Sequence, residues 1–268
     1  MHGATPTGRA IQPQTLPRLG TVDTRFQSYN VEIAEVIGGE FWKPYTAGGT
    51  VAKSTGTQSF EIGKTPGMFE ARPPIDLANH RLRVLAAALG PAYVRVSGTW
   101  ANSVYFQDDD EPRLAKPPPG FQSVLTRAQW RGVIEFSRAV DAELVTSFAI
   151  SAGVRDAAGV WTPKQATPLL DFTRQIGGTI TAAELFNEPT IPTAGGAPAG
   201  YDAALFARDE AAFRQFIKKT APQILIAGPG SVGEGGVTMF PASVPTLRSE
   251  DLLDSSPQPS SIYSPIIS

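Results

Sequence analysis

The chain has 268 residues, of which 41% are hydrophobic and 18% are charged, so it can bury one large core or two small ones. A formal net charge of −2 gives it none of the basic excess by which proteins bind nucleic acid or an anionic membrane. With no Cys and only two His, it has no disulfide or thiolate metal site and too little material for a His-rich one.

Residues 1–24 are polar and rich in Pro and Gly, which predicts a flexible leader ahead of a folded domain at 25–268. The leader has no apolar stretch of the kind that forms a signal peptide, so the sequence leaves the location of the protein open. Elsewhere no apolar run approaches the roughly 20 residues that cross a bilayer, and no membrane partner is expected.

Short runs of β-forming residues alternate with helical patterns along the rest of the chain. The first run, 26–36, predicts a strand that carries Glu32, and the Gly-, Pro- and Thr-rich stretch 38–74 predicts an insertion with a hairpin. Apolar residues at helical spacing predict a helix over 76–89. The run "AYVRVSG" (92–98) predicts the second strand.

Helix caps mark two of the later helices. Thr126 and Gln129 fit a capping box, and Thr162 and Gln165 fit another, with Pro163 at the first helical position. The remaining elements continue the alternation. They are strands at 142–151, 177–186 and 223–228, helices at 201–220 and 243–253, and a sixth strand at 260–264.

Strands buried on both faces and alternating with amphipathic helices predict an α/β fold with a parallel sheet wrapped by helices. An open doubly wound sheet and a (β/α)₈ TIM barrel are the two candidates. Polar residues at the ends of several strands favour the barrel, because barrel active sites gather there: Glu32, Ser97 to Thr99, and Asn187 with Glu188. Only five or six of the eight βα units are found, so we expect an incomplete barrel.

The stretch "TAAELFNEPTIP" (181–192) is an apolar run that ends on Asn187 and Glu188 and is stopped by Pro189. A strand-end carboxylate often serves only as a salt-bridge partner or a helix cap. Here the apolar strand would deliver the carboxyl group of Glu188 to a partly dry setting, which suits a general acid. The adjacent amide can hydrogen-bond a sugar hydroxyl while the acid protonates a glycosidic oxygen.

The segment "FNEP" (186–189) resembles the Asn-Glu-Pro motif at the end of the fourth strand in a large clan of retaining (β/α)₈ glycosidases. Within that clan "LRVLAAALGPAYVRVSGTWANSVYF" (82–106) is similar to a segment of glycoside hydrolase family 79, the heparanase and β-glucuronidase family. "RFQSYNVEI" (25–33) resembles the first barrel strand of that family, and "QILIAGPGSVG" (223–233) resembles its fifth. The likeness runs in the same order over roughly residues 22–265.

The resemblance implies a role for each matching residue. Glu188 matches the general acid/base, and Asn187 matches the amide beside it. Glu32 matches an acidic contact to a sugar hydroxyl, and Thr99 and Asn102 match polar residues that line the substrate pocket. Ser97 stands where the heparanases have Gly, and Asn102 where they have Asp, so the uronoside and its linkage stay open.

Two further side chains complete the predicted site. Trp100, beside Thr99, offers an aromatic face on which a sugar can stack. Tyr93 and Arg95 alternate on the second strand, and in this clan an Arg inside the barrel commonly holds the acidic residues in place. The resemblance implies no metal ligand in this site and no organic cofactor.

A retaining glycosidase needs a second carboxylate about 5–5.5 Å from the first. The family supplies this nucleophile from the seventh strand, which we expect beyond residue 268, together with a C-terminal β-sandwich domain. We therefore expect either a hydrolase of β-linked uronosides or a catalytically incompetent fragment or carbohydrate-binding remnant of one. The expected partner is an oligo- or polysaccharide containing uronic acid, and the resemblance implies a secreted or periplasmic location.

A third reading comes from "GPGSVG" (228–233), which matches the G-x-G-x-x-G fingerprint of dinucleotide-binding enzymes. Such a fingerprint opens a helix, whereas Pro229 and the glycine-rich stretch that follows favour an ordinary loop after a strand. A nucleotide-binding oxidoreductase is therefore the remote alternative.

Overall fold

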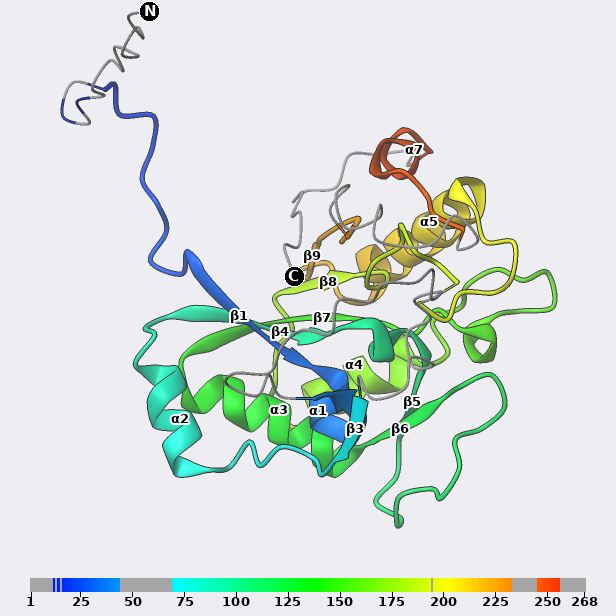
Figure 1. The fold of residues 1–268 in the computed structure, drawn as a ribbon, viewed down its shortest axis with the longest axis horizontal. Helices are drawn as coiled ribbons and strands as arrows, with labels where there is room; N and C mark the ends of the chain where they lie inside the picture. Colours follow the sequence, from blue (N-terminus) through cyan, green and yellow to red (C-terminus); the bar gives the residue numbers. More distant parts are fainter. Residues whose placement is uncertain are drawn as a thin grey trace, which may run out of the picture.

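In this computed structural model the described residues are 12, 14, 16–43, 69–193, 195–232 and 245–255. They form an α/β fold around a five-stranded sheet with the strand order β1-β4-β7-β8-β9, in which all neighbours are parallel (Figure 1). The strands are β1 (Gln27–Glu32), β4 (Ala92–Ser97), β7 (Ala142–Ser147), β8 (Ala182–Glu184) and β9 (Leu225–Ile226). The predicted α/β class and parallel sheet are confirmed.

Helices connect successive strands of this sheet. They are α2 (His80–Ala87) before β4, α3 (Arg127–Ala139) before β7, α4 (Ala166–Gln175) before β8 and α5 (Ala203–Thr220) before β9. A last helix, α7 (Ser249–Ser255), packs against α5 (Figure 1). Sequential strands that are neighbours and run parallel are the arrangement that βα repeats produce.

Two small sheets accompany the main one. Strands β2 (Gly39–Trp42) and β3 (Phe69–Arg72) pair antiparallel, which confirms paired strands in the predicted insertion; residues 44–68 between them lie outside the described residues. Strands β5 (Val104–Gln107) and β6 (Ser123–Thr126) pair parallel and were not predicted. The short 3₁₀ helix η2 (Thr99–Ser103) links β4 to β5.

The first predicted strand is too long, because β1 ends at Glu32 and the helix α1 (Ile33–Ile37) follows without a loop. The backbone N–H of Glu32 donates to Oε2 of Glu35 at 3.0 Å, so a side chain in the first helical turn supplies the acceptor at this junction. The apolar residues that follow Glu32 therefore pack as a buried helix, not as strand.

The predicted capping box at Thr162 is wrong, because α4 begins only at Ala166. The hydroxyl of Thr162 donates to the carbonyl of Val154 at 2.6 Å, and Oε1 of Gln165 accepts from the backbone N–H of Phe106 at 2.6 Å. Both groups that would cap a helix are therefore engaged with other segments. The box at Thr126 and Gln129 is confirmed at the start of α3.

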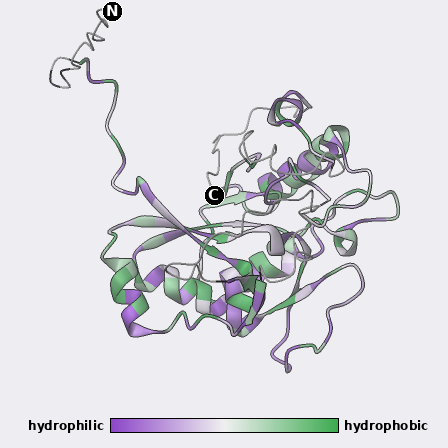
Figure 2. Cartoon of the chain, viewed as in Figure 1, coloured by the Kyte–Doolittle hydropathy of each residue, from purple (hydrophilic) through white to green (hydrophobic). Residues whose placement is uncertain are grey.

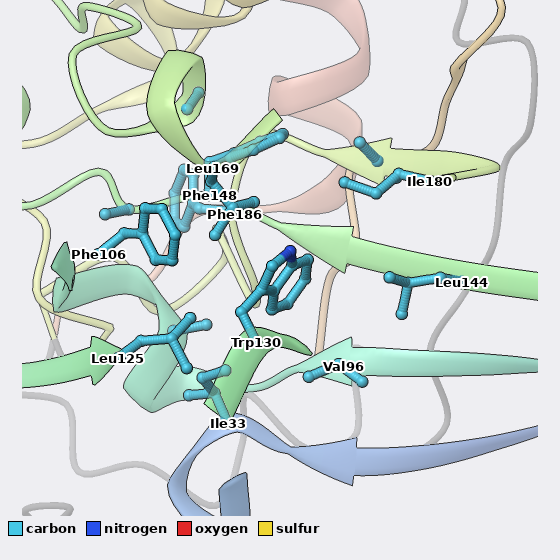
Figure 3. Packing of buried hydrophobic residues seen from close by; sticks show 14 of the residues in the cluster. Ile33, Val96, Phe106, Leu125, Trp130, Leu144, Phe148, Leu169, Ile180 and Phe186 are labelled. Atoms are coloured by element: carbon cyan, nitrogen blue, oxygen red, sulfur yellow. The ribbon is translucent and has the colours of Figure 1, made fainter. Parts of the chain in front are cut away.

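The core lies between the sheet and its helices (Figure 3). Trp130 of α3 is 1% exposed, and its Nε1–H donates to the hydroxyl of Thr173 on α4 at 2.8 Å. Hydrophobic residues alternate with hydrophilic ones along α2 and α3 (Figure 2). Leu85 of α2 and Leu89, beyond its end, fall within the predicted helix 76–89 but are exposed, whereas Ala86 of α2 is buried.

Strands β1 and β9 form the two edges of the five-stranded sheet. Beyond β9 the sixth predicted strand, at 260–264, lies outside the described residues. The eight-stranded barrel therefore stays a prediction, while the five parallel strands are shown.

Candidate functional site

The last residues of four neighbouring strands are polar and lie at one end of the sheet. Glu32 ends β1, Ser97 ends β4, Ser147 ends β7 and Glu184 ends β8. Because the strands are parallel and in register, their carboxyl ends meet at the same edge, where α/β folds place their binding sites. The candidate site is built on this edge.

Asn187 and Glu188 follow β8 after two buried apolar residues. Phe186 is 1% exposed and packs edge-on against the rings of Tyr201 and Phe206, which anchors the chain just before the motif. Glu188 has a φ of 54°, a left-handed conformation that is uncommon for a residue with a side chain. A backbone in this conformation is strained and persists only where surrounding contacts hold it. Such residues are enriched at functional sites.

The carboxyl group of Glu188 is half-buried and held by Thr99. The hydroxyl of Thr99 donates to Oε2 of Glu188 at 2.9 Å, so η2 and the end of β8 meet at this bond. The backbone N–H of Glu188 donates to the carbonyl of Gly230 at 3.0 Å, which fixes the residue from the side of β9. The predicted acid is therefore oriented from two neighbouring segments.

Asn187 is buried and held at every polar atom. Its Oδ1 accepts from Nη2 of Arg95 at 2.7 Å, and its Nδ2 lies 3.4 Å from the hydroxyl of Thr99. Asn102 binds its backbone twice, accepting from the N–H and donating to the carbonyl, each at 3.0 Å. Asn102 is 0% exposed, so in this structure it fixes the motif, and its contact with a sugar stays a prediction.

Glu32 lies against the backbone of Gly98. A Cβ added at Gly98, whose φ is +100°, would lie 1.5 Å from Oε2 of Glu32, so glycine leaves the space that the carboxyl group fills. Oε1 accepts from Nδ2 of Asn30 at 2.7 Å. Burial, with the negative charge of Glu188 nearby, raises the pKa of Glu32 to about 7 against the opposing effects of Asn30 and Arg95.

Glu184 is the site residue that the sequence interpretation did not name. It is 3% exposed, accepts from Nη2 of Arg95, and its Oε1 also accepts from the hydroxyl of Ser97 at 3.1 Å. Burial raises the pKa of its carboxyl group, while Arg95 and Ser97 oppose that effect. A Glu inside the apolar run "AAELF" was the available signal, because a buried carboxylate needs a partner.

Trp100 belongs to an aromatic cluster beside the carboxylates. Its ring lies 5.7 Å from that of Phe41 and 6.0 Å from that of Phe69, measured between centroids, and Phe69 lies 4.6 Å from Trp42. The β2–β3 pair therefore joins the segment that carries Thr99. Stacking of a sugar on Trp100 remains a prediction.

The glycine-rich stretch 228–233 also borders the site. Gly230 pairs with Asn187 in a parallel bridge, and a Cβ at Gly228 would lie 3.8 Å from Cβ of Glu184. The loop thus packs against the backbone of Asn187 and the Cβ of Glu184. The last Gly of the pattern, Gly233, lies outside the described residues.

The described residues contain no group of three or more His, Asp or Glu placed to share a metal ion. None of their helices combines the length and apolar character needed to cross a membrane. Compared with known proteins, the chain matches no family model and no curated sequence.

Proposed function

We propose that this chain carries the acid/base half of a retaining β-glycosidase active site and acts on β-linked uronosides. Glu188 would donate a proton to the glycosidic oxygen as the bond to the leaving group breaks, and would later take a proton from the attacking water. Asn187, Thr99 and Glu32 would bind sugar hydroxyls, with Trp100 stacking on a ring. The resemblance to glycoside hydrolase family 79 supports the substrate class and the (β/α)₈ barrel.

The observation that carries the proposal is the position of Asn187 and Glu188. They follow β8, the fourth strand of the parallel sheet, and their side chains are bonded to residues of the second strand and its following helix. That is the place of the Asn-Glu-Pro motif in the glycosidase clan. A carboxyl held by one hydroxyl and left half-buried can exchange a proton with a ligand and with water.

The nucleophile is proposed to lie outside the described residues. Two described carboxylates, Glu32 and Glu184, interact electrostatically with Glu188. Glu184 is buried and bonded to Arg95 and Ser97, and Glu32 is closed in by Gly98 and Asn30. Neither has the freedom to attack a sugar carbon, which is the reason for seeking the nucleophile elsewhere.

The charge of the cluster bears on the choice of sugar. Its described residues include three carboxylates, Glu32, Glu184 and Glu188, and one guanidinium, whose Nη1 and Nη2 already donate to Asn30, Glu184 and Asn187. A uronate would add a further negative charge here. We therefore expect the carboxylate of the substrate to be bound by groups outside this cluster.

The test is hydrolysis of an alkyl β-glucuronide, with the matching β-glucoside as a second substrate. Glu188→Gln should lower turnover by about 100- to 10,000-fold, because an unactivated leaving group needs the proton. Glu135→Gln, on an exposed position of α3, is the matched control and should leave turnover unchanged. Equal turnover of Glu188→Gln and the wild type would remove Glu188 from the mechanism.

The second candidate is a carbohydrate-binding or catalytically incompetent fragment. The observation that favours it is the pair of edge strands, β1 and β9, each with one neighbour among the described strands. Absence of turnover together with a rise of the unfolding temperature in glucuronic acid would favour binding alone. A rise of the unfolding temperature in the presence of NAD(H) instead would favour the nucleotide-binding alternative.

A further inference from the structure

The guanidinium of Arg95 lies among the carboxylates at the end of the sheet. Its side chain is 13% exposed, pairs with Glu184 of β8 and acts electrostatically on Glu32 of β1. Glu188, after β8, in turn acts electrostatically on both of these carboxylates. The only direct ion pair of Arg95 among the described residues is with Glu184. The charges that face Glu32 from the packed elements are Arg95, Glu188 and Glu35.

The ion pair is held on both sides. On one side, the hydroxyl of Ser97 donates to Oε1 of Glu184 at 3.1 Å and lies 2.6 Å from the hydroxyl of Ser147. On the other, Nη1 of Arg95 donates to Oδ1 of Asn30 at 3.1 Å and Nη2 also reaches Asn187. Every acceptor of the Arg95 nitrogens is therefore an amide oxygen or Glu184.

Arg95 orients the side-chain amides of Asn30 and Asn187. Because Oδ1 of Asn30 accepts from Arg95, its Nδ2 is turned to Glu32, and because Oδ1 of Asn187 accepts from Arg95, its Nδ2 is turned to Thr99. Arg95 thus acts on the outer carboxylates through neutral amides. It does not neutralise them by direct contact.

We propose that Glu184 is a positioning residue that keeps Arg95 paired below the site, so that Glu32 and Glu188 have no direct counter-ion within the described part of the chain. The roles of Glu32 and Glu188 toward a sugar rest on the proposed function, whereas the charge arrangement does not. A buried carboxyl group without a direct counter-ion holds its proton to higher pH, and this is the direction in which the pKa of Glu32 is shifted. Glu184 would touch neither substrate nor the reacting atoms.

The substitution Glu184→Gln separates charge from shape. The amide oxygen of Gln can still accept from Arg95, but the negative charge is gone, so the field of Arg95 acts fully on Glu32. The proton of Glu32 should then be lost at lower pH, by one pH unit or more. A purely structural role for Glu184 predicts no such shift in a folded variant.

The experiment is a pH titration of the ¹³C-labelled Glu side-chain carboxyl carbons of the whole chain by NMR, with the Glu32 signal assigned by Glu32→Gln. The matched control is Glu210→Gln, which changes an equally buried Glu that is paired with Arg214 on α5. We expect the midpoint of Glu32 to fall in Glu184→Gln and to stay unchanged in Glu210→Gln. An unchanged or raised midpoint in folded Glu184→Gln overturns the proposal.

If Glu184→Gln fails to fold, the same NMR titration of the wild type keeps the test decisive, because it shows whether Glu184 or Glu32 takes up its proton first. Glu184 must remain a carboxylate over the pH range in which Glu32 takes up its proton, because only an ionised Glu184 offsets the positive charge of Arg95. Protonation of Glu184 before Glu32 would overturn the proposal. Neither readout needs turnover, so failure of glycoside hydrolysis would count against the proposed function and leave this inference standing.

Discussion

Asn102 holds the backbone of Asn187 from both sides, accepting from its N–H and donating to its carbonyl, each at 3.0 Å. The two residues are 85 positions apart, and both are buried. A single amide thereby satisfies a donor and an acceptor of a backbone segment that does not belong to a regular strand. The placement of the predicted acid, one residue further along, depends on this pair.

Asn102→Asp tests that dependence. The Asp keeps the shape and one acceptor, but it sets a second oxygen against the carbonyl of Asn187, so we expect a loss of about 1–3 kcal/mol in the free energy of unfolding. The loss should be smaller in acid, where a protonated Asp can donate. Urea unfolding measures it, and Asn79→Asp, at the exposed N-cap of α2, should be nearly neutral. Equal stability of Asn102→Asp and the wild type would contradict the clamp.

The left-handed backbone of Glu188 predicts an inverted preference for glycine. At a φ of 54° a Cβ is strained, so Glu188→Gly should unfold with a free energy about 1 kcal/mol higher than Glu188→Ala. Position 135 within α3 is the control, because there Gly should be about 1 kcal/mol less stable than Ala. If the Gly variant were less stable than the Ala variant at both positions, the strain at Glu188 would be refuted.

Gly98 is expected to tolerate no side chain while Glu32 is present. Gly98→Ala combines an unfavourable φ of +100° with a Cβ placed on the carboxyl oxygen, and should destabilise the fold by more than about 2 kcal/mol. Gly90→Ala, with a φ of +84° and open space around the Cβ, isolates the backbone contribution. In a Glu32→Ala background the cost of Gly98→Ala should shrink toward that of Gly90→Ala; an unchanged cost would exclude the clash.

Glu32 should make stability fall between weakly acidic and neutral pH. Its pKa of about 7 in the folded state lies above the ordinary value of 4.5, so the folded protein holds this proton more tightly than the unfolded chain. The resulting stabilisation is complete below pH 4.5 and is lost as the pH rises through about 7, with a slope of at most about 1.4 kcal/mol per pH unit.

Urea unfolding at several pH values between 5 and 8 measures that slope. Glu32→Gln should flatten it, and Glu135→Gln, on the exposed face of α3, should leave it as in the wild type. A slope that survives in Glu32→Gln would assign the pH dependence to another group.

Local patterns in the sequence were enough to predict much of the sheet and the helices. The capping box at Thr126, the strand at 92–98 and the helix at 201–220 are each encoded by residues that are neighbours in the sequence, and each is observed. The β5–β6 pair was missed because a parallel pair depends on contacts between separate segments. The predicted strand at 26–36 extended past Glu32 into the residues of α1, because a buried helix and a buried strand share the same apolar composition.

The site was predictable in position and less so in its connections. Strand-end logic placed Glu32, Thr99, Asn187 and Glu188 at one edge of the sheet, where the structure brings them together. The partner of Arg95 was not predictable from spacing, because Glu184 lies 89 residues further along the chain. The amide oxygen and the amide nitrogen of Asn102 likewise both bond to the backbone of Asn187, which no local sequence pattern connects to Asn102.

The direct passage from β1 into α1 limits how this edge of the sheet can vary in length. Glu32 is the last residue of a strand and precedes a buried helix, so an inserted residue at that point would displace either the strand register or the helix. The connection from β5 to β6, at 108–122, is long and largely exposed, and can absorb insertions without such a cost. Length changes should therefore be tolerated better in the β5–β6 connection than at the passage from Glu32 into α1.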